Sequence, residues 1–170
     1  KKKSDLDIER ERYSKRAEKN KQNSKLFQVK KRKHNLIDAP YIEIYFKSLL
    51  RNSNKDFKLL EICSGEGQCS EPILKYYKDI TFTDISKNSL DVIKRSYSSF
   101  LTESISFKEC NMELLPFDSE IFDIVACAGG LSYGDNQLVL NEIHRVLKPN
   151  GKFICIDSLN ENPIYKLNRY

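Results

Sequence analysis

The sequence predicts an α/β fold with a doubly wound, mostly parallel sheet. From residue 57 onward, short apolar runs typical of strands alternate with amphipathic stretches typical of helices. Residues 121–128 are apolar almost throughout, as expected for a central strand that is buried on both faces. Glycines follow the first apolar run, at a strand-to-helix turn. This alternation predicts a single sheet with helices on both faces.

Two helical segments are predicted before the sheet begins. Residues 5–22 are almost all helix formers without a clear apolar stripe, which indicates a solvated or frayed helix. Residues 41–50 form an amphipathic pattern. Residues 30–34 (KKRKH) are a basic cluster, interpreted either as a solvated surface run or as a contact for an anionic ligand. We therefore divide the chain into a basic N-terminal helical segment, 1–38, and an α/β domain, 39–170.

The first half of the domain predicts two strands, each followed by a helix. Strand 57–63 precedes helix 70–78, which carries a proline in its first turn. Strand 79–84 precedes a helix that begins after Ser86, a preferred N-cap residue. The apolar residues repeated on one face of that helix are Leu90, Ile93 and Tyr97.

The second half predicts three more strands and one helix. The strands are 104–110, 121–128 and 152–157, and the helix spans 135–147. Its inward-facing residues are predicted to be Val139, Ile143, Val146 and Leu147.

Composition excludes several other classes of protein. No run approaches the ~18 apolar residues of a membrane span, and no charged-then-apolar signal segment opens the chain. The five cysteines lack metal-ligand spacing, so we expect reduced thiols, no metal and a cytoplasmic location. Residues 1–34 hold fourteen Lys or Arg against five Asp or Glu, but the basic run at 30–34 has no interleaved aromatic residues to stack on bases. Nucleic-acid binding is therefore not favoured.

Residues 59–67 (LLEICSGEG) indicate a nucleotide-binding turn. Gly65 and Gly67 allow the backbone to approach a ligand without a clash from Cβ. The following helix points its N–H groups toward the same place, which is the usual crevice of an open α/β sheet. The alternative is a tight turn that simply requires glycine.

Asp84 lies 19 residues after Gly65, at the end of the second predicted strand. A carboxylate at about this spacing accepts hydrogen bonds from the hydroxyls of a ribose. The alternative is an acid that interacts with the dipole of the next helix. The cofactor is then a dinucleotide or S-adenosylmethionine. Ser70 stands where the dinucleotide fingerprint has its third glycine, which weakens the first option.

Two further blocks carry a resemblance to a known family. Residues 110–125 (CNMELLPFDSEIFDIV) resemble the D-x-E-x-L-P-F … F-D-x-V block of small Rossmann-like methyltransferases. Residues 142–151 (EIHRVLKPNG) are similar to the E-h-R-V-L-K-P-G-G block before strand five. With the glycine loop and Asp84, the blocks stand in family order over residues 57–157. The chain is thus identified as resembling class I, type 11-like, S-adenosylmethionine-dependent methyltransferases.

The resemblance implies a function and a cofactor site. The expected reaction moves a methyl group from S-adenosylmethionine to an O or N atom of a small molecule or glycan. Residues 157–169 resemble a subgroup often found with surface-polysaccharide genes. The implied cofactor-binding residues are Glu61, Ser64, Gly65, Gly67, Asp84, Ile85, Asn111, Met112, Ala128 and Gly129. The chain departs from the family at Cys63 and Asn150, which replace glycines, and at Asn111, which replaces an aspartate.

Catalytic residues are less clear from the sequence. Tyr133 and Asp135 follow the fourth strand and are candidates for contact with the acceptor and for a base. Asp135 is also a suitable N-cap for the next helix. His144 lies mid-helix, away from the loop, and is interpreted as structural, whereas His34 lies in the basic segment and belongs to no motif. Two alternative functions remain, a nicotinamide-dependent oxidoreductase and a non-catalytic cofactor-binding module.

The resemblance also implies a longer fold than these residues build. Family members continue after strand five with a helix and an antiparallel strand pair that completes a seven-stranded sheet. This sequence supplies five strands, and residues 159–170 predict only the start of a helix. We therefore expect a piece of a longer protein whose fifth strand, from Lys152, presents an apolar edge and favours self-association.

Overall fold

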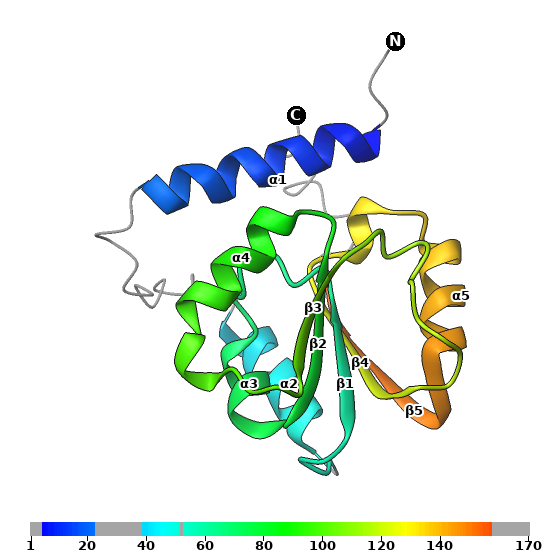
Figure 1. Ribbon diagram of the computed structural model, residues 1–170. Coiled ribbons are helices and arrows are strands. Elements are labelled where there is room, and N and C mark those ends of the chain that lie inside the picture. Colours follow the sequence, from blue (N-terminus) through cyan, green and yellow to red (C-terminus); the bar gives the residue numbers. More distant parts are fainter. Residues whose placement is uncertain (1–4, 23–38, 52, 158–170) are drawn as a thin grey trace.

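The computed structural model describes residues 5–22, 39–51 and 53–157. A five-stranded sheet of order β3-β2-β1-β4-β5 forms the centre, and every neighbouring pair is parallel (Figure 1). The strands are β1 (Lys58–Ile62), β2 (Asp79–Asp84), β3 (Ile105–Glu109), β4 (Phe122–Ala128) and β5 (Leu147–Ile156). The helices are α1 (Asp5–Gln22), α2 (Ala39–Leu50), α3 (Glu71–Tyr76), α4 (Lys87–Ser96) and α5 (Asn136–Val146). The predicted α/β class and the five predicted strands are confirmed.

Some of the predicted features lie outside the described residues. These are the basic cluster at 30–34, His34 and the helix expected at 159–170. Within the described ranges, no helix combines the length and the apolar character that a membrane crossing requires.

The order of the strands creates a switch point beside β1. The chain adds β2 and then β3 on one side of β1, and then crosses over to place β4 and β5 on the other side. Loops that leave the carboxyl ends of β1 and β4 therefore diverge to opposite sides of the sheet. A crevice between such loops is where open α/β sheets bind ligands.

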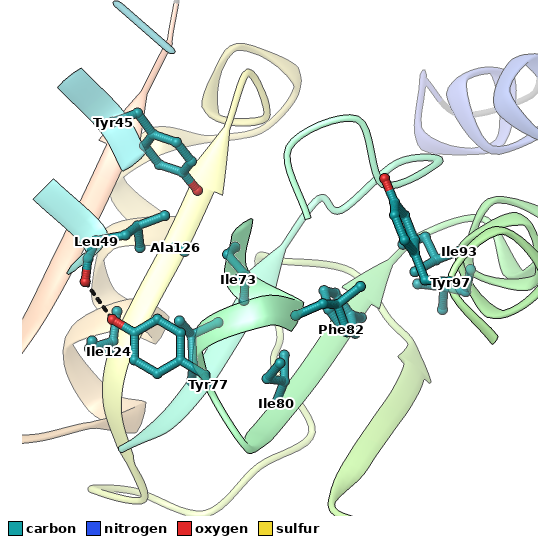
Figure 2. Close-up of a cluster of buried hydrophobic side chains, with 13 residues drawn as sticks. Tyr45, Leu49, Ile73, Tyr77, Ile80, Phe82, Ile93, Tyr97, Ile124 and Ala126 are labelled. Atoms are coloured by element: carbon teal, nitrogen blue, oxygen red, sulfur yellow. Dashed lines mark hydrogen bonds between the residues drawn. The ribbon is translucent and has the colours of Figure 1, made fainter. Parts of the chain in front are cut away.

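One face of the sheet is covered by α2, α3 and α4. Phe82 and Ile124 lie in the resulting core, and both side chains are fully buried (Figure 2). Tyr77, which follows α3, donates a hydrogen bond from its hydroxyl to the carbonyl of Leu49 in α2 (Figure 2). This bond ties the two helices together beneath the sheet.

The opposite face is covered by α5 and by the irregular connection between β3 and β4. Met112, Leu115 and Val125 share this core with α5. Glu142 of α5 accepts a hydrogen bond from the backbone N–H of Leu115, at 2.7 Å. Arg145 donates to the carbonyls of Phe117 and Leu115, at 2.7 and 2.9 Å. Glu142 and Arg145, which belong to the block at 142–151, therefore hold the Leu-Pro-Phe turn of the block at 110–125 in place.

Strand β5 begins earlier than the sequence predicts. It starts at Leu147, directly after α5, rather than at Lys152. Phe122 pairs with Leu147 whereas Ile124 pairs with Lys152, so residues 148–151 form a bulge. Asn150, which replaces a family glycine, has a φ of 67°, a left-handed conformation that asparagine adopts more readily than most residues.

Helix α1 differs from the solvated helix that its composition predicts. It lies across the carboxyl ends of the strands, beside α4 (Figure 1). Ala17 in the middle of α1 is only 1% exposed. The helix is thus packed on the α/β domain, although it lacks an apolar stripe.

Candidate functional site

A cavity of about 230 Å³ opens at the carboxyl ends of the strands, at the switch point of the sheet. Its walls come from the loop after β1, the end of β2, the segment after β3, the end of β4 and helix α1. The lining residues are Tyr13, Arg16, Cys63, Gly65, Glu66, Gln68, Thr83, Asp84, Ile85, Cys110, Asn111, Met112, Ala128, Gly129, Gly130 and Tyr133.

The glycine loop after β1 turns sharply at the cavity. Cys63 and Gly65 have φ values of 53° and 54°, so both residues are left-handed. Cys63 therefore occupies a conformation that favours the glycine of the family. Gly67 has a φ of 82°, and a Cβ there would lie 3.0 Å from side-chain atoms of Ile93 and Tyr97. Gly67 allows the loop to pack against α4 and is not among the lining residues.

Asp84 connects the glycine loop to the end of β2. Its Oδ2 accepts a hydrogen bond from Gly65 N–H, and its Oδ1 accepts one from Ser86 N–H, both at 2.9 Å. Burial raises the pKa of Asp84, and the backbone N–H groups of Ser86, Gly65 and Ile85 oppose that shift. A carboxylate accepts about four hydrogen bonds, so capacity for ligand hydroxyls remains.

Glu61 lies beneath the loop rather than in the cavity. Its side chain is 2% exposed and accepts a hydrogen bond from Ser70 Oγ at 2.6 Å. Burial raises the pKa of Glu61 to about 8, with a further contribution from Asp84. Ser70 thus satisfies a buried carboxyl group, which a glycine at this position does not do.

Asn111 and Met112 form the wall that follows β3. The Asn111 side chain accepts from Glu113 N–H at 3.0 Å and donates to Glu113 Oε2 at 3.2 Å. Met112 Sδ accepts a hydrogen bond from the Cys63 thiol at 3.2 Å. The thiol at position 63 therefore joins the glycine loop to this wall.

The two catalytic candidates lie in different surroundings. Tyr133 lines the cavity, and its ring packs edge-on against Tyr13 of α1 at a centroid distance of 6.0 Å. Asp135 does not line the cavity. Its Oδ1 caps α5 by accepting from the N–H groups of Gln137 and Leu138, at 2.9 and 3.3 Å. His144 is exposed on α5, away from the lining residues.

Seven of the ten residues implied by the resemblance line the cavity, and Glu61, Ser64 and Gly67 do not. Ser64 is buried and donates to the Glu61 carbonyl at 3.0 Å, so it stabilises the loop from within. The lining residues that sequence reasoning missed are Tyr13, Arg16, Cys63, Glu66, Gln68, Thr83, Cys110 and Gly130. Six of them are close neighbours of implied residues in the sequence, whereas Tyr13 and Arg16 carry no such signal.

No group of three or more His, Cys, Asp or Glu residues that suits a metal ion occurs among the described residues.

Comparison with known proteins places these features in a family. Residues 60–155 match the family described as "Methyltransferase domain". The demethylmenaquinone methyltransferase of Lactococcus lactis subsp. lactis is 36% identical over 114 residues, which cover 64% of this chain and 45% of that protein. The chain spans about half the length of the curated relatives that it matches.

Solved structures share the fold. The YcgJ protein from Bacillus subtilis aligns with a TM-score of 0.67 and 24% identity, covering 77% of this chain and 58% of that one. A geranyl diphosphate C-methyltransferase from Streptomyces coelicolor, solved with Mg2+, geranyl diphosphate and S-adenosyl-L-homocysteine, aligns with a TM-score of 0.61 and 18% identity. That match covers 69% of this chain and 45% of the other.

Proposed function

The chain belongs to the methyltransferase domain family that matches residues 60–155, and from this premise we propose that it binds S-adenosylmethionine in the cavity and transfers the methyl group to an acceptor. The observation that carries the proposal is the hydrogen bond from Gly65 N–H to Asp84 Oδ2 at the switch point. It places a glycine loop and a buried carboxylate on one cavity, which is the arrangement that a ribose-containing ligand needs.

The lining residues suit the parts of this cofactor. Asp84 would accept hydrogen bonds from the ribose hydroxyls. Ile85 and Met112 supply apolar surface for the adenine, with Asn111 at its edge. Gly129 follows β4, which lies on the other side of β1 from β2 and Asp84, and the sulfonium would lie beside its backbone, which has no side chain.

In methyl transfer the protein mainly aligns three atoms, which are the nucleophile, the methyl carbon and the sulfur. The nucleophile on the acceptor donates an electron pair to the methyl carbon, the carbon–sulfur bond breaks, and the sulfur retains the electron pair of that bond. Since the methyl group is already activated, alignment in line with the breaking bond supplies much of the rate enhancement. Tyr133 and Tyr13, which pack against each other in the cavity wall, would restrict the position of the acceptor.

The lining residues favour an acceptor whose nucleophilic atom reacts without a general base from the protein. An unactivated alcohol needs a general base. No histidine or lysine occurs among the described residues that line the cavity, and Asp135 is a helix cap. The two lining carboxylates already have partners, since Glu66 is paired with Arg16 and Asp84 accepts from backbone N–H groups. We therefore extend the proposal to an electron-rich carbon, such as the ring carbon of an ionised hydroxyarene, rather than the O or N atom that the resemblance implies. After the methyl group is added, that ring carbon loses its proton to solvent water, which restores the aromatic ring. The names of the demethylmenaquinone methyltransferase and the geranyl diphosphate C-methyltransferase support this direction.

Titration calorimetry tests the cofactor. We expect S-adenosylhomocysteine to bind more tightly than NAD to the 170-residue chain. Tighter binding of NAD would contradict the assignment. The acceptor is tested by incubating the protein with isotopically labelled S-adenosylmethionine and matched pairs of ring compounds, with and without a free hydroxyl group. Label on a ring carbon supports the carbon acceptor, and label confined to oxygen or nitrogen contradicts it.

A further inference from the structure

Two opposite charges face each other at the rim of the cavity. Arg16 Nε of helix α1 lies 3.7 Å from Glu66 Oε1 of the glycine loop, and both residues line the cavity. The Glu66 side chain is 10% exposed, whereas that of Arg16 is 47% exposed. Arg16 is the one cation, and Glu66 and Asp84 are the two anions, among the described lining residues.

The position of Arg16 is fixed by the rest of α1. In the preceding residues, the Ser14 hydroxyl lies 3.2 Å from the Ser86 hydroxyl, and Tyr13 packs against Tyr133. Arg10 donates from Nε to the carbonyl of Ile85 at 3.4 Å. Directly after Arg16, Ala17 is 1% exposed. The guanidinium is therefore presented at the cavity by a docked helix.

The amino-acid end of S-adenosylmethionine carries an α-carboxylate and an α-ammonium group. If the ribose lies at Asp84, this end extends along the glycine loop, toward Glu66. A carboxylate that leaves water needs a partner of opposite charge, and Arg16 is the described cation within the cavity wall. The ammonium group needs an acceptor, which Glu66 offers.

We propose that Arg16 and Glu66 together bind the amino-acid end of the cofactor, with Arg16 on the carboxylate and Glu66 on the ammonium group. The inference rests on the cofactor assignment made above and adds the residues that recognise its zwitterion. When the ligand binds, the Arg16–Glu66 pair is replaced by two new pairs, Arg16 with the carboxylate and Glu66 with the ammonium group. Each charge keeps a partner of opposite sign, so no buried charge is left alone. Guanidinium–carboxylate pairs are frequently bidentate, which would also fix α1 over the bound ligand.

The test compares two ligands that differ only at this end. S-adenosylhomocysteine has the amino-acid group, and methylthioadenosine has the same nucleoside and sulfur without it. Calorimetry measures both affinities for the wild-type chain, Arg16→Ala and Glu66→Gln. A charge-assisted hydrogen bond at a partly exposed site corresponds to about tenfold in affinity. We expect Arg16→Ala to bind S-adenosylhomocysteine about tenfold more weakly and methylthioadenosine within twofold of wild type.

The control is Lys19→Ala, which removes the same charge from α1 at an exposed position outside the cavity wall. It should change neither affinity by more than twofold. Equal losses of affinity for both ligands in Arg16→Ala, or no loss, would overturn the proposal. An unchanged affinity of Glu66→Gln for S-adenosylhomocysteine would overturn it as well. Failure of the wild-type chain to bind S-adenosylhomocysteine would instead refute the cofactor assignment. Circular dichroism checks that each variant is folded.

Discussion

Glu61→Gln should abolish a pH dependence of stability that originates beneath the glycine loop. The Glu61 carboxyl is 2% exposed, and its hydrogen-bond partner is the neutral hydroxyl of Ser70. Asp84, a second acid, lies close enough to disfavour its ionisation further. Glutamine has nearly the same shape, still accepts from Ser70 and carries no charge.

The sign of the effect follows from the shift in pKa. The pKa of Glu61 rises from 4.5 to about 8 on folding, so the native state holds this proton more tightly than the unfolded state. The stabilising contribution is fully present below pH 4.5 and is lost as the pH rises through 8. At about 1.4 kcal/mol per pKa unit, the full shift corresponds to an upper bound of about 5 kcal/mol. Relaxation around the charge reduces this bound, and we expect about 2 kcal/mol or more.

The assay is urea denaturation followed by far-ultraviolet circular dichroism, at several pH values from 5 to 9. The free energy of unfolding of wild type relative to Glu61→Gln should fall by about 2 kcal/mol or more across this range. Glu71→Gln is the matched control, because Glu71 is paired with Lys75 on the surface of α3. The difference in free energy of unfolding between Glu71→Gln and wild type should stay nearly constant from pH 5 to 9. Parallel curves for wild type and Glu61→Gln would refute the reasoning.

Three other substitutions separate binding from folding. Asp84→Ala should weaken binding of S-adenosylhomocysteine by roughly 1–3 kcal/mol, because hydrogen bonds to a charged group are lost; unchanged calorimetric affinity in a folded variant would assign Asp84 a purely structural role. Asp135→Ala should lower the free energy of unfolding by about 1 kcal/mol, measured with urea, and leave that affinity unchanged, since it removes an N-cap. In Gly130→Ala, the new Cβ would lie 2.5 Å from Cys63 Cβ and 2.8 Å from its sulfur. We expect a loss of about 1–3 kcal/mol in urea denaturation, and Cys63→Gly in the same chain should restore it; a double variant no more stable than Gly130→Ala would contradict the packing argument.

The sheet was predictable because its signals are local. Residues 121–128 are apolar almost throughout, and burial of β4 on both faces explains why. The start of β5 was not predictable, because Pro149 and Gly151 look like the end of a helix when read alone. The structure instead uses them in a bulge that lets Leu147 pair with Phe122. That pairing depends on a strand far away in the sequence.

The glycine-loop motif located the site but not the direction of each side chain. Successive residues of a strand point to opposite faces. Glu61 shares with Leu59 the face covered by α2 and α3, and it meets Ser70 there instead of the cavity. The resemblance names Glu61 as a site residue, but in the structure its carboxyl lies beneath the loop and contacts Ser70, so a role in binding would be indirect, through the loop.

Helix α1 was the least predictable wall because its contacts are polar and distant in sequence. Among the residues of α1 whose burial is described, Ala17 alone is buried, so no apolar stripe marks the face that docks. The docking depends on contacts of Arg10, Ser14 and Arg16 with the segments that shape the cavity. Exposed polar contacts of this kind contribute little each, so α1 is held less firmly than the strands. A ligand that bridges Arg16 and Asp84 would add to that hold, and by linkage a firmly docked α1 would bind the ligand more tightly. Under the proposed contacts of Arg16 and Asp84 with the cofactor, the docking of α1 would therefore respond to cofactor binding.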